Sequence, residues 1–149
     1  MNMKKILFFS MVMLISQSAC ALTVVVKNYF YQSDTDPMKV RLIYTGAPGW
    51  RDMWGKESAS YNTGLSHVQG LQVLYKKNGA LVCKSFDINT YITQVLRKNK
   101  SLRGLGTIEL NIVKNKVGDP EVNIFGNTEA IKLAINYVEY YIKTSTPCQ

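Results

Sequence analysis

One segment of the chain concentrates side chains that could bind a ligand, between Thr45 and His67. It holds both tryptophans, Trp50 and Trp54, in a polar and glycine-rich stretch with no clear helical or strand period. Connections longer than about 12–15 residues without regular structure are uncommon and often functional. Indole rings can stack on sugar rings or anchor a partner protein. We therefore expect a binding surface here, with the alternative that both indoles fold inward and cover one end of a sheet.

Charged and hydrogen-bonding side chains accompany the two tryptophans. The predicted binding residues are Trp50, Arg51, Asp52, Trp54, Lys56, Tyr61 and His67. If Trp50 to Trp54 forms one helical turn, the two indoles share a face. This combination of aromatic and charged groups suits a protein partner or an anionic glycan.

The same segment offers the alternative of a small hydrolase acting through Asp52, Glu57 or His67. The chain has a single histidine and lacks the G-x-S-x-G signature of a nucleophile elbow. Asp52 and Glu57 are the only acids near aromatic residues that could serve as a glycosidase pair. One histidine and scattered acids do not provide a tight cluster of metal ligands. The sequence therefore predicts no catalytic residue, no metal and no cofactor, and favours a non-enzymatic protein.

A basic cluster lies at the C-terminal end of a helix predicted over Asp87–Asn99, and it is the second candidate surface. Its members are Arg97, Lys98, Lys100 and Arg103. Such an edge could contact phosphate or sulfate groups, or it could be a solvated helix end that interacts with the helix dipole. The following "RGLGT" lacks the spacing and the Lys-Ser/Thr pair of a phosphate-binding loop, so nucleotide binding is rejected and nucleic acid is not an expected partner.

The three cysteines are Cys20, Cys83 and Cys148. If Cys20 leaves with an export signal, the remaining two can form one disulfide in an oxidising compartment. That bond would close a loop of about 65 residues and contribute roughly 4 kcal/mol in the chain-entropy model. The alternative is two unrelated buried thiols. Neither cysteine belongs to a C-x-x-C motif, which argues against redox catalysis and zinc binding.

Residues 1–21 have the order of a secretory signal peptide. Lys4 and Lys5 precede an apolar run at residues 6–15, which is too short to span a bilayer, and small residues follow. Ala19-Cys20-Ala21 fits an ordinary signal peptidase, which would cut after Ala21. A lipoprotein signal would need an aliphatic residue at Gln17, so acylation of Cys20 is the less favoured route. We expect a soluble periplasmic or extracellular protein of bacterial origin, with eukaryotic secretion as the alternative.

The mature chain would have 149 − 21 = 128 residues, enough for one domain with its own core. The formal charge of +8 becomes 8 − 2 = +6 after loss of Lys4 and Lys5. A basic surface favours anionic polysaccharides, lipid head groups or acidic proteins. No second apolar run is long enough to cross a membrane.

Alternating or β-branched patterns predict six strands in this mature chain. They cover Leu22–Tyr31, Met38–Tyr44, Val68–Lys76, Ala80–Phe86, Gly106–Lys114 and Glu121–Phe125. The first two are expected to form a hairpin. Asn78-Gly79 is the strongest turn signal, because a type I′ turn requires positive φ at both central positions.

Two helices are predicted from a 3.6-residue period, over Asp87–Asn99 and Thr128–Lys143. The second has apolar residues around much of its circumference, which suggests cover by another element or by a partner. The order ββ-ββα-ββα predicts an α+β two-layer domain over residues 22–149, with a mostly antiparallel sheet of about six strands and two helices on one face.

These patterns predict a small secreted or periplasmic binding protein that uses its Trp-containing loop. The alternatives are a secreted hydrolase and an envelope or secretion assembly component that docks through its C-terminal helix. The oligomeric state is left open.

Overall fold

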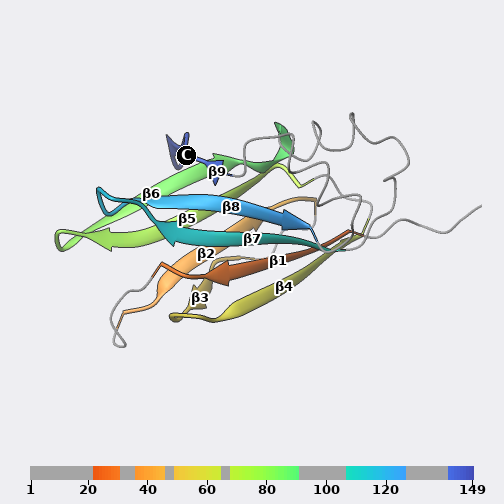
Figure 1. Ribbon diagram of the computed structural model, residues 1–149, viewed down its shortest axis with the longest axis horizontal. Coiled ribbons are helices and arrows are strands. Elements are labelled where there is room, and N and C mark those ends of the chain that lie inside the picture. The colour runs from red at the N-terminus through yellow and green to blue at the C-terminus, as the bar shows by residue number, and fades with distance from the viewer. Residues whose placement is uncertain (1–21, 31–35, 46–48, 65–67, 91–106, 127–140) are drawn as a thin grey trace, which may run out of the picture.

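The computed structural model describes residues 22–30, 36–45, 49–64, 68–90, 107–126 and 141–149, and these residues form ten β-strands in two five-stranded sheets (Figure 1). Sheet A has the order β4 (Ser58–Gly64), β1 (Leu22–Asn28), β7 (Thr107–Lys114), β8 (Pro120–Gly126), β9 (Tyr141–Ile142). Sheet B has the order β10 (Thr146–Pro147), β6 (Ala80–Asp87), β5 (Gly70–Lys77), β2 (Met38–Ile43), β3 (Arg51–Met53).

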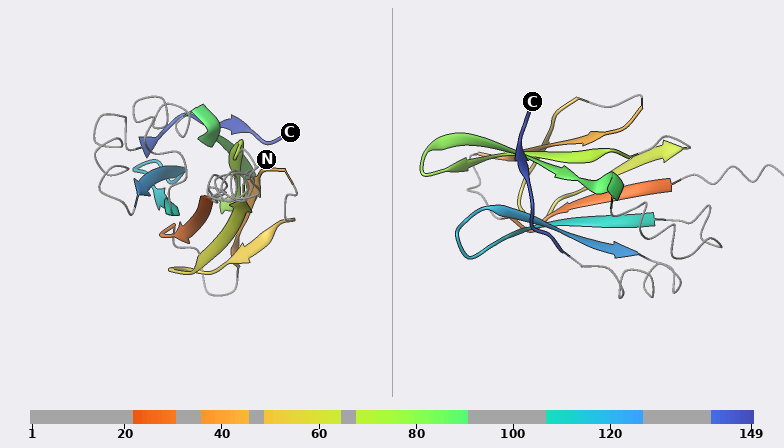
Figure 2. Two further views of the ribbon diagram at one scale, coloured as in Figure 1. Left: turned by 90° about the vertical axis from the view of Figure 1, so that its right-hand side faces the viewer. Right: turned by 90° about the horizontal axis from the view of Figure 1, so that it is seen from above.

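The two sheets lie as two layers, which the right-hand view of Figure 2 shows from above. Strand alternation places one side of each sheet in the shared core. In β2, Met38, Val40 and Leu42 are fully buried, whereas Lys39 between them is exposed. Each large apolar side chain buried in this way contributes about 1.5–3 kcal/mol of transfer free energy. The core therefore lies between the sheets, and the alternate residues of each strand point outward.

The predicted α+β class is wrong. Sixty-five per cent of the structure is strand and 4% is helical, and within the described residues no helix reaches seven residues. The predicted first helix begins with a single helical turn at Ile88–Thr90, and the Asp87 carboxylate accepts a hydrogen bond from the Thr90 amide at 3.1 Å. Residues 91–99 of that prediction lie outside the described residues.

The predicted C-terminal helix is contradicted at its end. Tyr141 and Ile142 form β9 and pair with β8, with Ile142 opposite Val122 and Tyr141 opposite Asn123. Cross-strand pairing at the edge of sheet A determines the conformation of this short apolar segment, and local helical periodicity does not. Residues 128–140 lie outside the described residues.

The predicted pairing of the first two strands is also wrong. β1 belongs to sheet A, where it lies between β4 (antiparallel) and β7 (parallel), whereas β2 belongs to sheet B. Alternation showed which residues face the core, but it carries no information about which strand is the neighbour.

The β5–β6 hairpin matches its prediction. Asn78 has φ of 51° and Gly79 has φ of 79°, as a type I′ turn requires. The strands pair in continuous register from Lys77 opposite Ala80 to Gly70 opposite Asp87.

The chain crosses between the sheets at both sides of the sandwich. On one side it passes from β3 of sheet B to β4 of sheet A through residues 54–57. On the other side it passes from β9 of sheet A to β10 of sheet B through residues 143–145. The predicted Cys83–Cys148 disulfide is present and joins the segment after β10 to β6. At each side of the sandwich, an edge strand of one sheet is thus connected through the backbone to an edge strand of the other sheet.

The part of the chain that the structure describes contains no helix with the length and apolar character needed to cross a membrane.

Candidate functional site

The segment that carries both tryptophans is largely regular structure, contrary to the prediction of a long loop. It contains β3, the crossover at residues 54–57, and β4. Trp50 directly precedes β3 and is 40% exposed, and Trp54 directly follows β3 and is 41% exposed. Neither indole fills the core, and Met53 between them is the buried member of this strand.

Trp50 stacks on Arg41, which in turn is hydrogen-bonded to Gln72, on the outer face of sheet B. The Arg41 guanidinium carbon lies 4.9 Å from the centre of the Trp50 ring, in the geometry of a cation–π contact. Arg41 Nε and Nη2 both donate to Gln72 Oε1, at 3.0 Å and 2.6 Å. These two bonds hold the guanidinium in position against the indole.

The register of three neighbouring strands produces this stack. Arg41 lies opposite Gln72 in the β2–β5 pair, and Lys39 lies opposite Asp52 in the β2–β3 pair. Because side chains two residues apart share a face, Arg41 and Lys39 point outward together. Gln72 belongs to the central strand and is only 7% exposed, which suits a fixed acceptor.

An ion pair extends the stack along β3. Lys39 Nζ lies 3.0 Å from Asp52 Oδ1, and both side chains are about half exposed. An exposed pair of this kind contributes about 0–1 kcal/mol to stability. We call Trp50, Arg41, Lys39 and Asp52 the Trp50 face, because they lie side by side on the outer surface of β2 and β3.

The crossover after β3 is anchored to the end of β1 by Asn28, which is 1% exposed. Its side-chain amide donates to the carbonyl oxygens of Met53 at 3.1 Å and Trp54 at 3.0 Å. Its Oδ1 accepts the Phe30 amide at 2.9 Å. A further backbone bond of 2.8 Å runs from the Lys56 amide to the Asn28 carbonyl. The position of the tryptophan segment therefore depends on one buried amide in the other sheet.

Lys56 and Glu57, which the sequence placed near the site, have local structural roles. Lys56 has φ of 66°, the left-handed conformation that closes a tight turn. Glu57 Oε2 accepts the Trp54 amide at 2.8 Å, and the Glu57 amide donates to the Trp54 carbonyl at 3.1 Å. This reciprocal pair closes the turn.

Tyr61 and Arg51 lie away from the Trp50 face. Tyr61 is 6% exposed and belongs to the core, and burial raises the pKa of its phenol, with a smaller opposing effect from the Arg51 charge. Arg51 alternates with Trp50 and Asp52 along the strand, which is consistent with that placement. Tyr61 is thus removed from the surface, although the sequence suggested it.

The remaining predicted positions lie outside the described residues. They are His67, the basic edge of Arg97, Lys98, Lys100 and Arg103, and the predicted signal peptide at residues 1–21, which includes Cys20.

Sequence reasoning missed Arg41, Gln72 and Lys39. The sequence did contain a signal for Lys39 and Arg41, because the strict alternation in residues 38–44 places both on the outer side of a strand. Gln72 gave no such signal, since it lies within an apolar run whose central position in the sheet is visible only in the structure.

The Trp50 face can provide apolar contact, charge complementarity and hydrogen bonding. Among the described residues, no group of three or more histidine, cysteine, aspartate or glutamate side chains could hold a metal ion. Comparison with known proteins gives no match to a family model, a curated protein or a solved structure.

Proposed function

We propose that this chain is an exported binding module that recognises a partner protein through the Trp50 face. The observation that carries the proposal is the Arg41–Trp50 contact at 4.9 Å, fixed by Gln72 on the outer surface of sheet B. Tryptophan and arginine are the residues most enriched among those that dominate binding energy at protein interfaces.

The shape and charge of the surface favour a protein over a small molecule. Small-molecule sites are concave, whereas the Trp50 face lies on the outer side of adjacent strands in a sheet. The face carries both signs of charge, from Lys39, Arg41 and Asp52, which allows complementary pairing with polar groups at the rim of an interface.

Preorganisation supports the same assignment. Ordering a long side chain on binding costs about 0.5–1.5 kcal/mol, and the two hydrogen bonds to Gln72 order Arg41 in advance. The exposed indole then offers a rigid apolar surface that loses little conformational freedom. Export is supported by the signal-like N-terminus in the sequence and by the Cys83–Cys148 disulfide.

A site-specific photocrosslinker tests the proposal in the producing cells. p-Benzoylphenylalanine replaces Trp50 in one strain and Leu81 in another, since Leu81 is 66% exposed near the tip of the β5–β6 hairpin, and β6 is three strands away from β3 in sheet B. We expect a discrete crosslinked partner from position 50 and none from position 81.

Binding of the identified partner to purified protein is then measured by calorimetry. Trp50→Ala and Arg41→Ala should each weaken the affinity at least tenfold, whereas Leu81→Ala leaves it unchanged and all three variants melt within a few degrees of the parent. The same partner crosslinking from both positions, or undiminished affinity of Trp50→Ala, would contradict the proposal.

A further inference from the structure

A concave site lies at the tip of the β7–β8 hairpin, outside the Trp50 face. The hollow has a volume of about 430 Å³. Its lining residues are Lys114, Asn115, Lys116, Val117, Glu121 and Lys143. This volume lies within the range of about 300–1,000 Å³ that small-molecule sites occupy. We call it the hairpin pocket.

The hairpin pocket carries uncompensated positive charge. Three lysines and one glutamate line it, so its formal charge is 3 − 1 = +2. The ion pairs among the described residues join other lysines to acids, and none of them includes Lys114, Lys116 or Lys143. Lys114 Nζ instead lies 5.5 Å from the centre of the Phe30 ring. A concave surface of one sign concentrates ions of the other sign.

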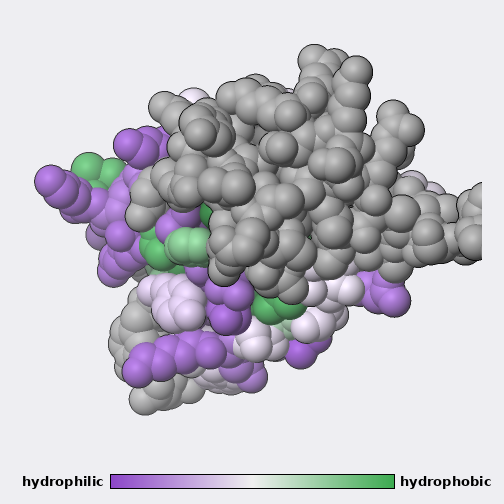
Figure 3. All heavy atoms as spheres, turned by 45° about the vertical axis from the view of Figure 1, so that its right-hand side comes forward, coloured by the Kyte–Doolittle hydropathy of each residue, from purple (hydrophilic) through white to green (hydrophobic). Residues whose placement is uncertain are grey.

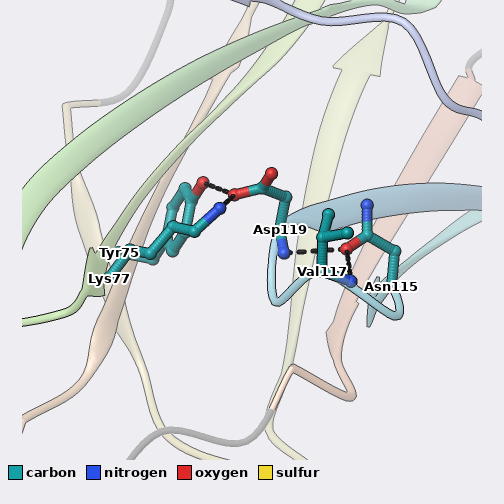
Figure 4. A network of polar contacts seen from close by, with 5 residues as sticks. All are labelled: Tyr75, Lys77, Asn115, Val117 and Asp119. Atoms are coloured by element: carbon teal, nitrogen blue, oxygen red, sulfur yellow. Dashed lines mark hydrogen bonds and ion pairs between the residues drawn. The ribbon is translucent and has the colours of Figure 1, made fainter.

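The turn that forms one wall of the pocket is held by its own hydrogen bonds (Figure 4). Asn115 Oδ1 accepts the amides of Val117 at 3.0 Å and Asp119 at 2.9 Å. The Asn115 amide donates to the Asp119 carbonyl at 2.8 Å, and Gly118 adopts the φ of 86° that the turn requires. Residues 115–119 are therefore preorganised.

The acid of this turn is directed away from the pocket lysines. Figure 4 shows the Asp119 carboxylate pointing toward β5, where its Oδ1 accepts hydrogen bonds of 2.7 Å from both the Tyr75 hydroxyl and Lys77 Nζ. These donors hold the pKa of Asp119 below its usual value, with Lys77 the larger influence. The charge of Asp119 is thus neutralised by Lys77, and the pocket retains its positive charge.

We propose that the hairpin pocket binds a phosphate or sulfate ester on a small polar molecule such as a sugar. Lysine ammonium groups bind such oxyanions as point charges and do not require the planar, bidentate geometry of a carboxylate held by arginine. The lysine stems and the 68%-exposed Val117 supply apolar surface for the rest of the ligand. Figure 3 shows mainly hydrophilic residues at the left end of the molecule, with a few hydrophobic ones among them.

Titration of the mature, oxidised protein followed by ¹⁵N–¹H correlation spectra tests the proposal. Glucose 6-phosphate and glucose 6-sulfate serve as probes, with glucose as the neutral control. Both anions should shift the amides of residues 115–118 saturably, and glucose should not. The phosphate and sulfate arms show which ester the pocket prefers, and the affinity should fall as sodium chloride increases.

Paired variants separate a pocket from general attraction to a basic protein. Lys116→Gln/Lys143→Gln should weaken binding at least tenfold and leave the melting temperature unchanged. The matched control Arg51→Gln/Lys56→Gln removes two exposed positive charges elsewhere and should change the affinity less than twofold. Glu121→Gln should tighten binding, because it raises the formal charge of the pocket to +3.

Equal losses of affinity in the two double variants, or equal amide shifts with glucose, would overturn the proposal. Trp50→Ala should leave this affinity intact, so the two proposed sites fail or succeed independently.

Discussion

The Tyr75 hydroxyl donates a 2.7 Å hydrogen bond to Asp119 Oδ1, and this bond joins the β5–β6 hairpin of sheet B to the β7–β8 hairpin of sheet A. The Tyr75 side chain is 1% exposed and meets the Phe30 ring edge to face at 5.3 Å. The hydroxyl of a core residue in sheet B therefore finds its hydrogen-bond acceptor in a turn of sheet A.

Asp119→Ala should destabilise the protein by about 1–3 kcal/mol, because it removes the acceptor of a nearly buried hydroxyl. Urea unfolding at pH 7 measures the loss. In the Tyr75→Phe background the same substitution should cost distinctly less, and an unchanged cost there would show that the bond is not the cause. Asp52→Ala, which removes only an exposed ion pair, should cost less than about 1 kcal/mol.

The Asp119 contribution should depend on pH. Hydrogen bonds from Lys77 and Tyr75 lower the pKa of Asp119 in the folded protein, so the unfolded chain takes up the proton at a higher pH, near the ordinary value of about 3.9. The stabilisation is complete above that value and is lost as the pH falls through the lower pKa of the folded state. The stability difference between the parent and Asp119→Ala should shrink as the pH falls below about 4, because the unfolded chain then takes up the proton before the folded protein does. A constant difference over that range would contradict this assignment.

Asn28→Ala should lower the free energy of unfolding by about 2–3 kcal/mol. The substitution leaves the carbonyls of Met53 and Trp54 and the Phe30 amide without their side-chain partner. Asn28→Asp provides the comparison, since it keeps an acceptor for Phe30 but loses the two donated bonds. Chemical denaturation should rank the parent above Asn28→Asp and Asn28→Ala, and fluorescence should report a changed environment for Trp54.

Reduction of the Cys83–Cys148 bond should destabilise the fold by about 4 kcal/mol in the chain-entropy model, because 65 residues separate the two cysteines. Thermal unfolding with and without a reductant measures the loss. The Cys83→Ser/Cys148→Ser variant should have the same melting temperature as the reduced parent. A double variant with the melting temperature of the oxidised protein would show that the disulfide does not stabilise the fold.

Two glycines should respond to alanine for different reasons. At Gly70 an added Cβ would lie 2.9 Å from the Phe86 carbonyl oxygen, so a neighbouring strand must shift, at about 1–3 kcal/mol. At Gly79 no atom lies within 4 Å, and the cost of about 1–2 kcal/mol comes from the positive φ. Gly49→Ala meets nothing within 4 Å and is the neutral control. If Gly49→Ala lowers the free energy of unfolding as much as Gly70→Ala and Gly79→Ala do, this explanation is contradicted.

The sequence predicted the strands that alternate or are rich in β-branched residues, and it missed strands with neither pattern. Ile108, Leu110 and Ile112 are buried as their period required, and the Asn78-Gly79 turn is present. β4 escaped notice because its inward residues include only one large side chain, Tyr61, among small and polar neighbours. β3 is three residues long, and such a strand has no detectable period.

The helix predictions show the limit of periodicity more clearly. Ile142 fits a helical stripe, yet it is 1% exposed as part of β9 opposite Val122. An apolar residue near a chain end satisfies either pattern, and the available neighbour decides between them. The same limit applies to the candidate site, because the Trp50 face depends on the register of β2, β3 and β5, and register is not encoded in any one segment.

The parallel pairing of β1 with β7 has a consequence for how the protein folds. Val24 lies beside Ile108, so the two residues are 108 − 24 = 84 positions apart along the chain. Contacts of such high sequence separation slow the search for the native state, since loop-closure entropy is lost before any pairing energy is gained. Strand β1 can therefore complete its pairing in sheet A only after β7 is in place. We expect the folding nucleus to form around the local β5–β6 hairpin, and β1 to join sheet A late in folding.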